Sequence, residues 1–507
     1  MNKWLIALAV MLPTLIEIID TSVVNVSLNH IRGALSAGLD ESTWTITAYL
    51  VSNAIVIPMS GWLSRLIGRK RYLLTSIVIF TTSSFLCGCA WSLQSLVVFR
   101  IMQGIGGGGL VPLCQSILLE AFPPKEHGIA MAIFGFGTMF GPIVGPFLGG
   151  WITDSWSWRW IFFINLPIGI FAIILNSIIL KDPPHMKKQV MSIDYWGLIF
   201  LVIGIGSIQY VLDKGQQDDW FSSPAILTCT IVALISLILL IINEIYHEHP
   251  IINLKLFKDR TYTMGNLVMF FTFFNLFGSI VLLPIFLQSM MGYTSFQAGL
   301  VLGPGGAATI ISMMFAGKFA HKINPKFLLG LGIIICSYTT YSMSQFNLQS
   351  DFWIFVAPRV TLGLGMGFIF IPLTITTLSH IPKEKMGEAT SIYNLLRNMG
   401  GSVGIAFATT MIARNSQVYQ SELVKNLTPF DTSYMMTIDK MSSYFSMKGL
   451  DGVSPDGLIF RELIRQSMTL AFTKTFLTFS ILMLSVLVLV FFMKITKSHD
   501  ATNVSSH

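Results

Sequence analysis

The feature that most constrains the fold of this chain is a series of apolar runs, each about 20 residues long, separated by short polar connections. Hydrophobic residues make up 53% of the 507 residues and charged residues 11%, too few charges to cover a soluble protein of this size. The runs therefore predict an all-α polytopic membrane protein. We expect fourteen spans, over residues 5–28, 43–64, 72–90, 94–119, 129–152, 160–180, 195–212, 224–244, 263–288, 295–316, 327–345, 353–377, 389–413 and 470–493.

Basic residues cluster in every second connection between these spans, for example at 65–71 and 318–326. The short connections on the other side hold Arg32, Arg159 and Lys214. Because cytoplasmic loops carry an excess of Lys and Arg, the pattern predicts that both termini are cytoplasmic. A long polar loop, expected over residues 414–469, then lies on the external side before the last span.

An internal repeat relates the fourth span to the twelfth. Arg100 and Gly104 recur as Arg359 and Gly363, and two further matches follow at nearly the same spacing, with offsets of 259, 260 and 258 residues. A parallel repeat of this kind predicts two six-helix bundles with a substrate site between them near the membrane midplane. The expected organisation is an N-terminal bundle (1–180), two inserted helices (181–262), a C-terminal bundle (263–493) and a cytoplasmic tail (494–507).

Two acidic residues, Glu17 and Asp20, lie inside the first apolar run. They fall about 20 and 24 Å along the helix, well inside a hydrocarbon core about 30 Å thick. Insertion of a charged group there costs about 2.5–3.5 kcal/mol, so such residues are candidates for function. Arg100, within the fourth span, needs a partner, and either acid is suitable. The alternative is that Arg100 bonds only to backbone carbonyls or polar side chains.

The fifth predicted span contains four glycines at intervals of four residues. Such spacing produces one smooth helix face that a neighbouring backbone can approach closely. Pro142 and Pro146 fall among these glycines and favour a kink, because each removes a helix hydrogen bond. A bendable face suits a gating helix, although ordinary helix packing also explains the pattern. The candidate gating residues are Gly137, Gly141, Pro142, Gly145, Pro146, Gly149 and Gly150.

Four stretches together resemble the fourteen-helix drug:proton antiporters of the major facilitator superfamily, in the EmrB/QacA-like branch. They are residues 20–26, 100–104, 137–150 and 158–169. The resemblance extends over essentially the whole chain and implies export coupled to protons, with Asp20, Glu17 and Arg100 as the proton-coupling residues. It also implies a substrate cavity, for which the candidates are Asn25, Trp44, Tyr49, Gln103, Phe136, Met139, Arg359, Asn394 and Arg397.

The connection between the second and third spans also resembles its counterpart in this superfamily, through Gly61, Gly68, Arg69 and Lys70. It differs at Arg65, which stands where most relatives carry an Asp. This difference puts in doubt any carried-over role for that acid in locking an inner gate. The basic residues of this loop can equally act as determinants of topology.

The resemblance implies a proton-driven multidrug exporter of hydrophobic compounds in the bacterial inner membrane. The tenth span has no acid, which favours neutral or weakly acidic compounds over dications. The loop at 414–469 implies a periplasmic adaptor protein and an outer-membrane channel as partners. We expect no enzyme activity, cofactor, metal or nucleic acid, since no Walker or zinc-protease motif is present. A dedicated exporter of a metabolite or siderophore is the alternative.

Overall fold

A computed structural model describes residues 2–182, 193–319, 322–425, 427–428, 430–447 and 454–494. All regular secondary structure in these ranges is helical. The first bundle consists of α1 (Lys3–Ala34), α2 (Leu39–Ile67), α3 (Arg69–Gly88), α4 (Leu93–Gly107), α5 (Leu110–Ala121), α6 (His127–Ser155), α7 (Trp160–Phe163) and α8 (Asn165–Ile179).

Two helices, α9 (Tyr195–Lys214) and α10 (Pro224–Tyr246), follow and pack against each other, and α9 also contacts α2 and α15. The second bundle consists of α11 (Arg260–Ser289), α12 (Ser295–Phe319), α13 (Pro325–Met343), α14 (Phe352–Leu378), α15 (Met386–Val424), α17 (Pro455–Ser485) and α18 (Leu487–Phe492). A separate helix, α16 (Thr432–Met447), precedes α17, and four short 3₁₀ helices lie at Pro124–Glu126, Trp220–Ser222, Leu254–Lys258 and Lys383–Lys385.

Twelve helical segments in the described part of the chain are long and apolar enough to cross a membrane. Among these twelve segments, α4 and α5 together form a single crossing, Leu93–Ala121. This crossing is interrupted at Gly108 and Gly109. The long helices α6 and α15 complete the fourteen expected, although they fall outside that set of twelve. α15 carries several polar residues, which lowers its mean hydropathy. The predicted all-α fold is therefore confirmed.

Polar residues next to the apolar runs determine where several helices begin. The side chain of Asn2 accepts a hydrogen bond from the backbone N–H of Trp4, and that of Asp259 accepts one from Tyr262. These bonds satisfy N–H groups that have no partner within the helix. Between α2 and α3 a single residue, Gly68, reverses the chain with φ +91°, a conformation that side chains with a Cβ rarely adopt.

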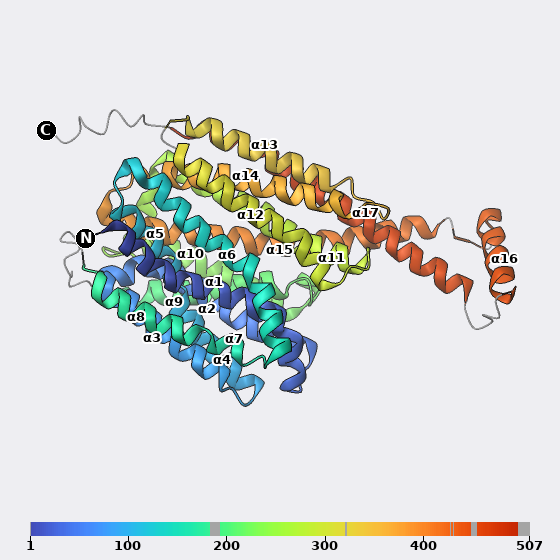
Figure 1. The fold of residues 1–507 in the computed structure, drawn as a ribbon, viewed down its shortest axis with the longest axis horizontal. Coiled ribbons are helices and arrows are strands. Elements are labelled where there is room, and N and C mark those ends of the chain that lie inside the picture. The colour runs from blue at the N-terminus through green and yellow to red at the C-terminus, as the bar shows by residue number, and fades with distance from the viewer. Residues whose placement is uncertain are drawn as a thin grey trace.

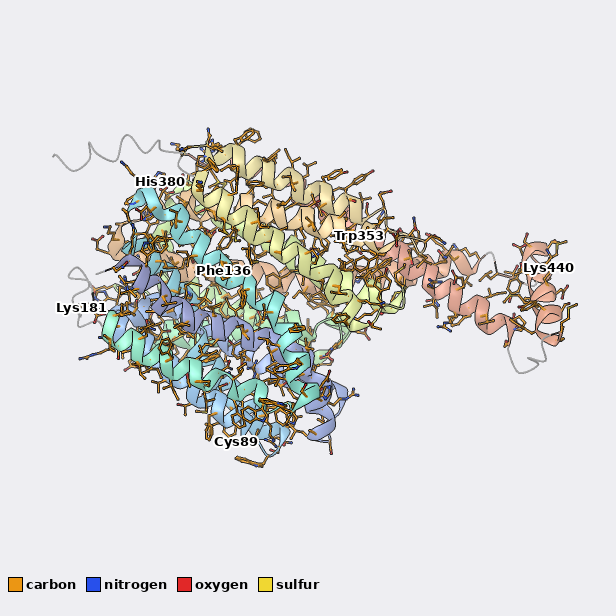
Figure 2. The ribbon with its side chains drawn as sticks, viewed as in Figure 1. Cys89, Phe136, Lys181, Trp353, His380 and Lys440 are labelled. Carbon is orange, nitrogen blue, oxygen red and sulfur yellow. The ribbon has the colours of Figure 1, made fainter. Side chains whose placement is uncertain are left out.

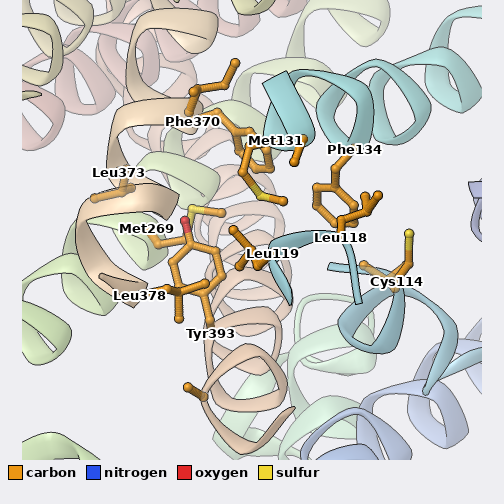
Figure 3. Packing of buried hydrophobic residues seen from close by; sticks show 14 of the residues in the cluster. Cys114, Leu118, Leu119, Met131, Phe134, Met269, Phe370, Leu373, Leu378 and Tyr393 are labelled. Carbon is orange, nitrogen blue, oxygen red and sulfur yellow. The ribbon is translucent and has the colours of Figure 1, made fainter. Parts of the chain in front are cut away.

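The two bundles meet at the end of the molecule that carries Lys3, which we call the N-terminal end (Figure 1). Helices α5 and α6 of the first bundle pack there against α12, α14 and α15 of the second. Figure 3 shows Leu119 and Phe134 on one side of this contact and Phe370 and Tyr393 on the other, all within one apolar core. The Phe134 and Phe370 rings stack with centroids 6.2 Å apart. This core closes the N-terminal end between the bundles.

Much of residues 414–469, expected as a long polar loop, is helical. α15 continues to Val424, α17 begins at Pro455, and α16 lies between them as a projection at the opposite end of the molecule (Figures 1 and 2). Hydropathy misses these helices because they lie outside the bundle and need no long apolar run. Ser454 caps α17 and Pro455 occupies its first turn, where a missing N–H costs nothing.

Candidate transport site between the bundles

The centre of the site is Asp20 on α1, a residue that is 1% exposed. Its Oδ2 accepts a hydrogen bond of 2.6 Å from Nη1 of Arg100 on α4. Its Oδ1 accepts hydrogen bonds from Gln103 on α4, at 2.9 Å, and from Asn165 on α8, at 2.8 Å. Charge-assisted bonds of this length are strong, so this carboxylate holds three helices of the first bundle together.

Arg100 has partners on every side. Its Nε donates to the backbone oxygen of Thr45 at 3.1 Å, and Nη1 also donates to Oε1 of Gln103 at 2.7 Å. The guanidinium carbon lies 4.1 Å from the centre of the Tyr49 ring, which favours a cation–π interaction. Burial of two charges is tolerated only with such complete pairing. Of the two acids that the sequence offers as partners, Asp20 is the one that pairs with Arg100.

Glu17 lies one helical turn from Asp20 and has different partners. Its Oε1 accepts hydrogen bonds from the Tyr49 hydroxyl, at 3.1 Å, and from Nδ2 of Asn53, at 3.2 Å, both on α2. Glu17 does not face Arg100, although the sequence allowed either acid to be the partner of this arginine. Instead, Glu17 is attracted by Arg397 on α15 of the second bundle. The Glu17 carboxylate on the first bundle is therefore within the electrostatic influence of a positive charge on the second.

Polar contacts join the two bundles near their N-terminal end. Nδ2 of Asn394 on α15 donates to Oε1 of Gln115 on α5 at 2.5 Å. The hydroxyl oxygens of Ser60 on α2 and Ser391 on α15 lie 2.7 Å apart. Because these residues belong to opposite bundles, any separation of the bundles at this end must break both bonds.

Arg65, the residue that departs from the superfamily pattern, forms an ion pair across the same interface. Its Nη1 lies 2.6 Å from Oε1 of Glu388 on α15, and Asn253 donates to Oε2 of Glu388 at 2.8 Å. The backbone approach is close, since a Cβ added at Gly61 would lie 2.7 Å from the Cα of Glu388. A basic residue at this position thus contacts the second bundle through an acid that the bundle itself supplies.

The rest of this loop stabilises the first bundle. Nη1 and Nη2 of Arg69 donate to the two carboxylate oxygens of Glu120 at 2.7 and 2.6 Å. The backbone N–H of Lys70 donates to Asp182 at 2.8 Å, and its ammonium group donates to the backbone oxygen of Ser177 at 2.6 Å. These contacts attach the start of α3 to the ends of α5 and α8.

The glycine run of α6 lies against α1. A Cβ added at Gly141 would lie 2.3 Å from a side-chain carbon of Ile18, and one at Gly145 would lie 2.4 Å from Cβ of Ser22. Gly137 and Gly149 similarly contact Met11 and Val23, whereas nothing lies within 4 Å of a Cβ at Gly150. α6 is one continuous helix, and the side chains of Pro142 and Pro146 lie outside the described residues.

The remaining cavity candidates do not form one group. Phe136, labelled in Figure 2, is 43% exposed on α6, and its neighbour Met139 is half-buried. Asn25 is exposed on α1. Trp44 instead stacks on Tyr210 of the inserted helix α9, with ring centroids 5.7 Å apart. Trp44 therefore lines a pocket beside the inserted pair, a position that hydropathy alone does not indicate.

Four polar residues of the site were missed as site residues from the sequence: Thr45, Asn53, Gln115 and Asn165. Asn53, Gln115 and Asn165 each interrupt an apolar run, and this is the signal that identifies them. Thr45 contributes its backbone oxygen, which carries no side-chain signal.

The fold and site define a membrane protein of two repeated helical bundles with a buried ion pair in the first. Two solved transporters share this fold: the human organic anion transporter MFSD10 (TETRAN), with a TM-score of 0.63, 12% identity and coverage of 97% of this chain and 100% of that one; and the proton:xylose symporter XylE, with a TM-score of 0.59, 14% identity and coverage of 95% of both.

Residues 10–405 match the family model of the Major Facilitator Superfamily, and the chain belongs to this family. Its relatives include "Multidrug export protein EmrB" of Escherichia coli (strain K12), 36% identical over 97% of this chain and 95% of the relative. "Fatty acid resistance protein FarB" of Neisseria gonorrhoeae is 34% identical over 96% of both chains. "Probable multidrug resistance protein EmrY" of Escherichia coli (strain K12) is 35% identical over 97% of this chain and 95% of the relative.

Proposed function

We propose that this protein is a proton-driven multidrug exporter of hydrophobic compounds. The observation that carries the proposal is the buried Asp20 carboxylate, which is paired with Arg100 and held by Gln103 and Asn165. The similarity to EmrB and EmrY supports drugs as substrates. The proton gradient supplies the energy in this proposal, so that no cofactor is required. A dedicated exporter of a metabolite or siderophore is the second candidate, and a panel of substrates separates the two.

Coupling follows from the chemistry of the ion pair. When Asp20 takes up a proton, its attraction to Arg100 disappears and the guanidinium keeps only neutral partners, namely Thr45, Gln103 and the Tyr49 ring. A change in the packing of α1 against α4 is then favourable. The membrane supplies about 2.3 kcal/mol per charge moved across 100 mV, which is enough to bias such a change.

We further propose that the N-terminal end of the bundles is cytoplasmic, in the inner membrane of a bacterium. Arg65, Arg69 and Lys70 gather there, as the positive-inside rule requires of a cytoplasmic surface. With this orientation the closed interface of Ser60–Ser391 and Arg65–Glu388 is an inner gate. Return to an inward-open state requires those contacts to break.

Helix α16 supports the proposal of a periplasmic adaptor and an outer-membrane channel. It lies beyond the bundles, where Figure 2 labels Lys440, and it exposes Met436, Tyr444 and Met447 by 57%, 57% and 85%. An apolar surface of this kind, outside the membrane, favours contact with another protein. Co-purification of an adaptor with the full chain, lost when Met436, Tyr444 and Met447 are changed to Ser, tests this part. Full drug resistance in cells that lack any adaptor would contradict it.

The export function is tested in inverted membrane vesicles with a chemically varied drug panel. Each exported drug is expected to accumulate in the vesicles when a pH gradient, acidic inside, is imposed, and to discharge part of that gradient. Accumulation of several unrelated hydrophobic drugs supports multidrug export, whereas accumulation of one metabolite favours the second candidate. Accumulation that is unaffected when the gradient is collapsed would contradict proton coupling.

A further inference from the structure

A pocket of about 220 Å³ lies beside the inserted helices, at the end of the molecule opposite to Lys3. It is formed by the first two turns of α2, the end of α9 and the turn that follows α9. Its lining residues are Trp44, Tyr210, Lys214, Gln217 and Asp218. Drug-sized ligands occupy pockets of about 300–1,000 Å³. This pocket is therefore too small for a whole drug molecule and suits a small polar group.

The buried wall of the pocket carries a positive charge. Lys214 is 5% exposed, and its Nζ donates hydrogen bonds to Oγ1 of Thr43 at 2.6 Å and to Oε1 of Gln217 at 2.9 Å. The same nitrogen lies 5.7 Å from the centre of the Trp44 ring. All these partners are neutral, and none of the ion pairs within the described residues includes Lys214. A buried ammonium group in neutral surroundings favours an anionic ligand.

The exposed rim of the pocket carries the opposite charge. The backbone N–H of Asp218 donates to the backbone oxygen of Lys214 at 3.0 Å, so the two residues lie close together. Their side chains nevertheless form no ion pair with each other. The Asp218 carboxylate acts electrostatically on the Tyr210 hydroxyl, which lines the same pocket. A ligand with one negative and one positive group, a zwitterion, would complement both charges.

Aromatic side chains surround this pocket. The rings of Trp44 and Tyr210 stack with centroids 5.7 Å apart, and Trp44 remains 41% exposed. Trp220 and Phe221 follow in the adjoining turn, and Phe221 is 61% exposed. Trp and Tyr are enriched where a membrane meets water, at the level of the lipid headgroups. The pocket is therefore at the depth at which a headgroup reaches it.

We propose that this pocket binds the zwitterionic headgroup of a phospholipid that carries a primary amine, such as phosphatidylethanolamine. Lys214 binds the phosphate in the buried wall, and Asp218 accepts hydrogen bonds from the ammonium group at the rim. The bound lipid contacts α2 of the first bundle and α9 of the inserted pair, and so stabilises their contact. This inference goes beyond the proposed export function and does not depend on the direction of transport.

The test measures which lipids stay bound to the purified full chain in mass spectra of the intact complex. The chain is offered equal amounts of phosphatidylethanolamine, phosphatidylcholine and phosphatidylglycerol with the same acyl chains. Choline has no N–H to donate and glycerol has no positive charge. Phosphatidylethanolamine should therefore be preferred about tenfold, as expected for one hydrogen bond to a charged group.

Three variants assign this preference to the pocket. Asp218→Asn should abolish it, whereas Asp219→Asn, the same change at the next exposed residue and outside the lining, should preserve it. Lys214→Gln should weaken binding of all three lipids, because the phosphate is common to them. Asp218 is exposed, so the result for Asp218→Asn does not depend on a change in folding.

Equal retention of phosphatidylethanolamine and phosphatidylcholine by the wild-type chain would overturn the proposal. So would an unchanged preference in Asp218→Asn, or an equal loss of preference in Asp219→Asn, which would indicate a general effect of surface charge. Glycerophosphoethanolamine, the same headgroup without acyl chains, should displace the lipid only at a much higher concentration. Displacement at an equal concentration would assign the pocket to a soluble zwitterion, and the lipid site would be wrong.

Discussion

Replacement of Arg65 by Ala is expected to open the interface at the N-terminal end of the bundles. Arg65 pairs with Glu388 at 2.6 Å, and the Glu388 side chain is 3% exposed. Without Arg65 that carboxylate keeps the single hydrogen bond from Asn253. Opening of the interface then hydrates Glu388, so the variant favours the open state over the closed one.

The magnitude follows from the burial of the two partners. Removal of one partner of a fully buried pair costs about 3–5 kcal/mol. The Arg65 side chain is 23% exposed, so water screens part of the interaction and the cost falls to the lower end of that range or below it. A cost of about 2–3 kcal/mol changes the ratio of closed to open molecules by about 30- to 150-fold.

Disulfide formation between Cys residues placed at positions 60 and 391 measures this ratio, because the native hydroxyls are 2.7 Å apart in the closed state. The assay uses a chain whose five native cysteines have been replaced. Arg65→Ala should slow cross-linking, and the double variant Arg65→Glu with Glu388→Arg should restore it. Arg71→Ala, which removes an exposed arginine at the start of α3, should leave cross-linking unchanged. Cross-linking of Arg65→Ala at the wild-type rate would refute the assignment of this pair as a lock.

Two further substitutions test the site and the helix packing. Glu17→Gln removes the negative charge that attracts Arg397, so export of a cationic dye in vesicles should slow by about tenfold at an unchanged level of protein. Dye export at the wild-type rate would contradict the role of Glu17. Gly141→Ala forces Ile18 on α1 to move and should destabilise the protein by about 1–3 kcal/mol, whereas Gly150→Ala, which meets nothing within 4 Å, should be neutral. Equal melting temperatures of these two variants would contradict the close packing of α6 on α1.

The fold is predictable from sequence because each span must satisfy its backbone internally and be apolar over about 20 residues. The Asp20–Arg100 pair is predictable for a related reason, since a buried charge requires a partner and few are available. The helices within 414–469 were not predictable by this route. Residues 414–424 extend α15 into a polar region, where hydropathy carries no information about helix formation.

Contacts between the bundles are the part of the site that the sequence does not reveal. Arg65 and Glu388 are 323 residues apart, and neither residue type is unusual in a polar loop or at the start of a helix. The same is true of Gln115 and Asn394, 279 residues apart. Trp44 also shows the limit, because only the position of α9 determines that its ring stacks on Tyr210.

The central claim is that Asp20 couples export to protons, and Asp20→Asn tests it most directly. Asn has the size of Asp and keeps an oxygen for the Gln103 and Asn165 donors, but it cannot carry the charge that pairs with Arg100. The measurement is drug-induced discharge of a pH gradient in inverted vesicles that contain equal amounts of the two proteins. The wild-type chain should discharge the gradient when drug is added, and Asp20→Asn should leave it intact. Discharge by Asp20→Asn at the wild-type rate would contradict the account.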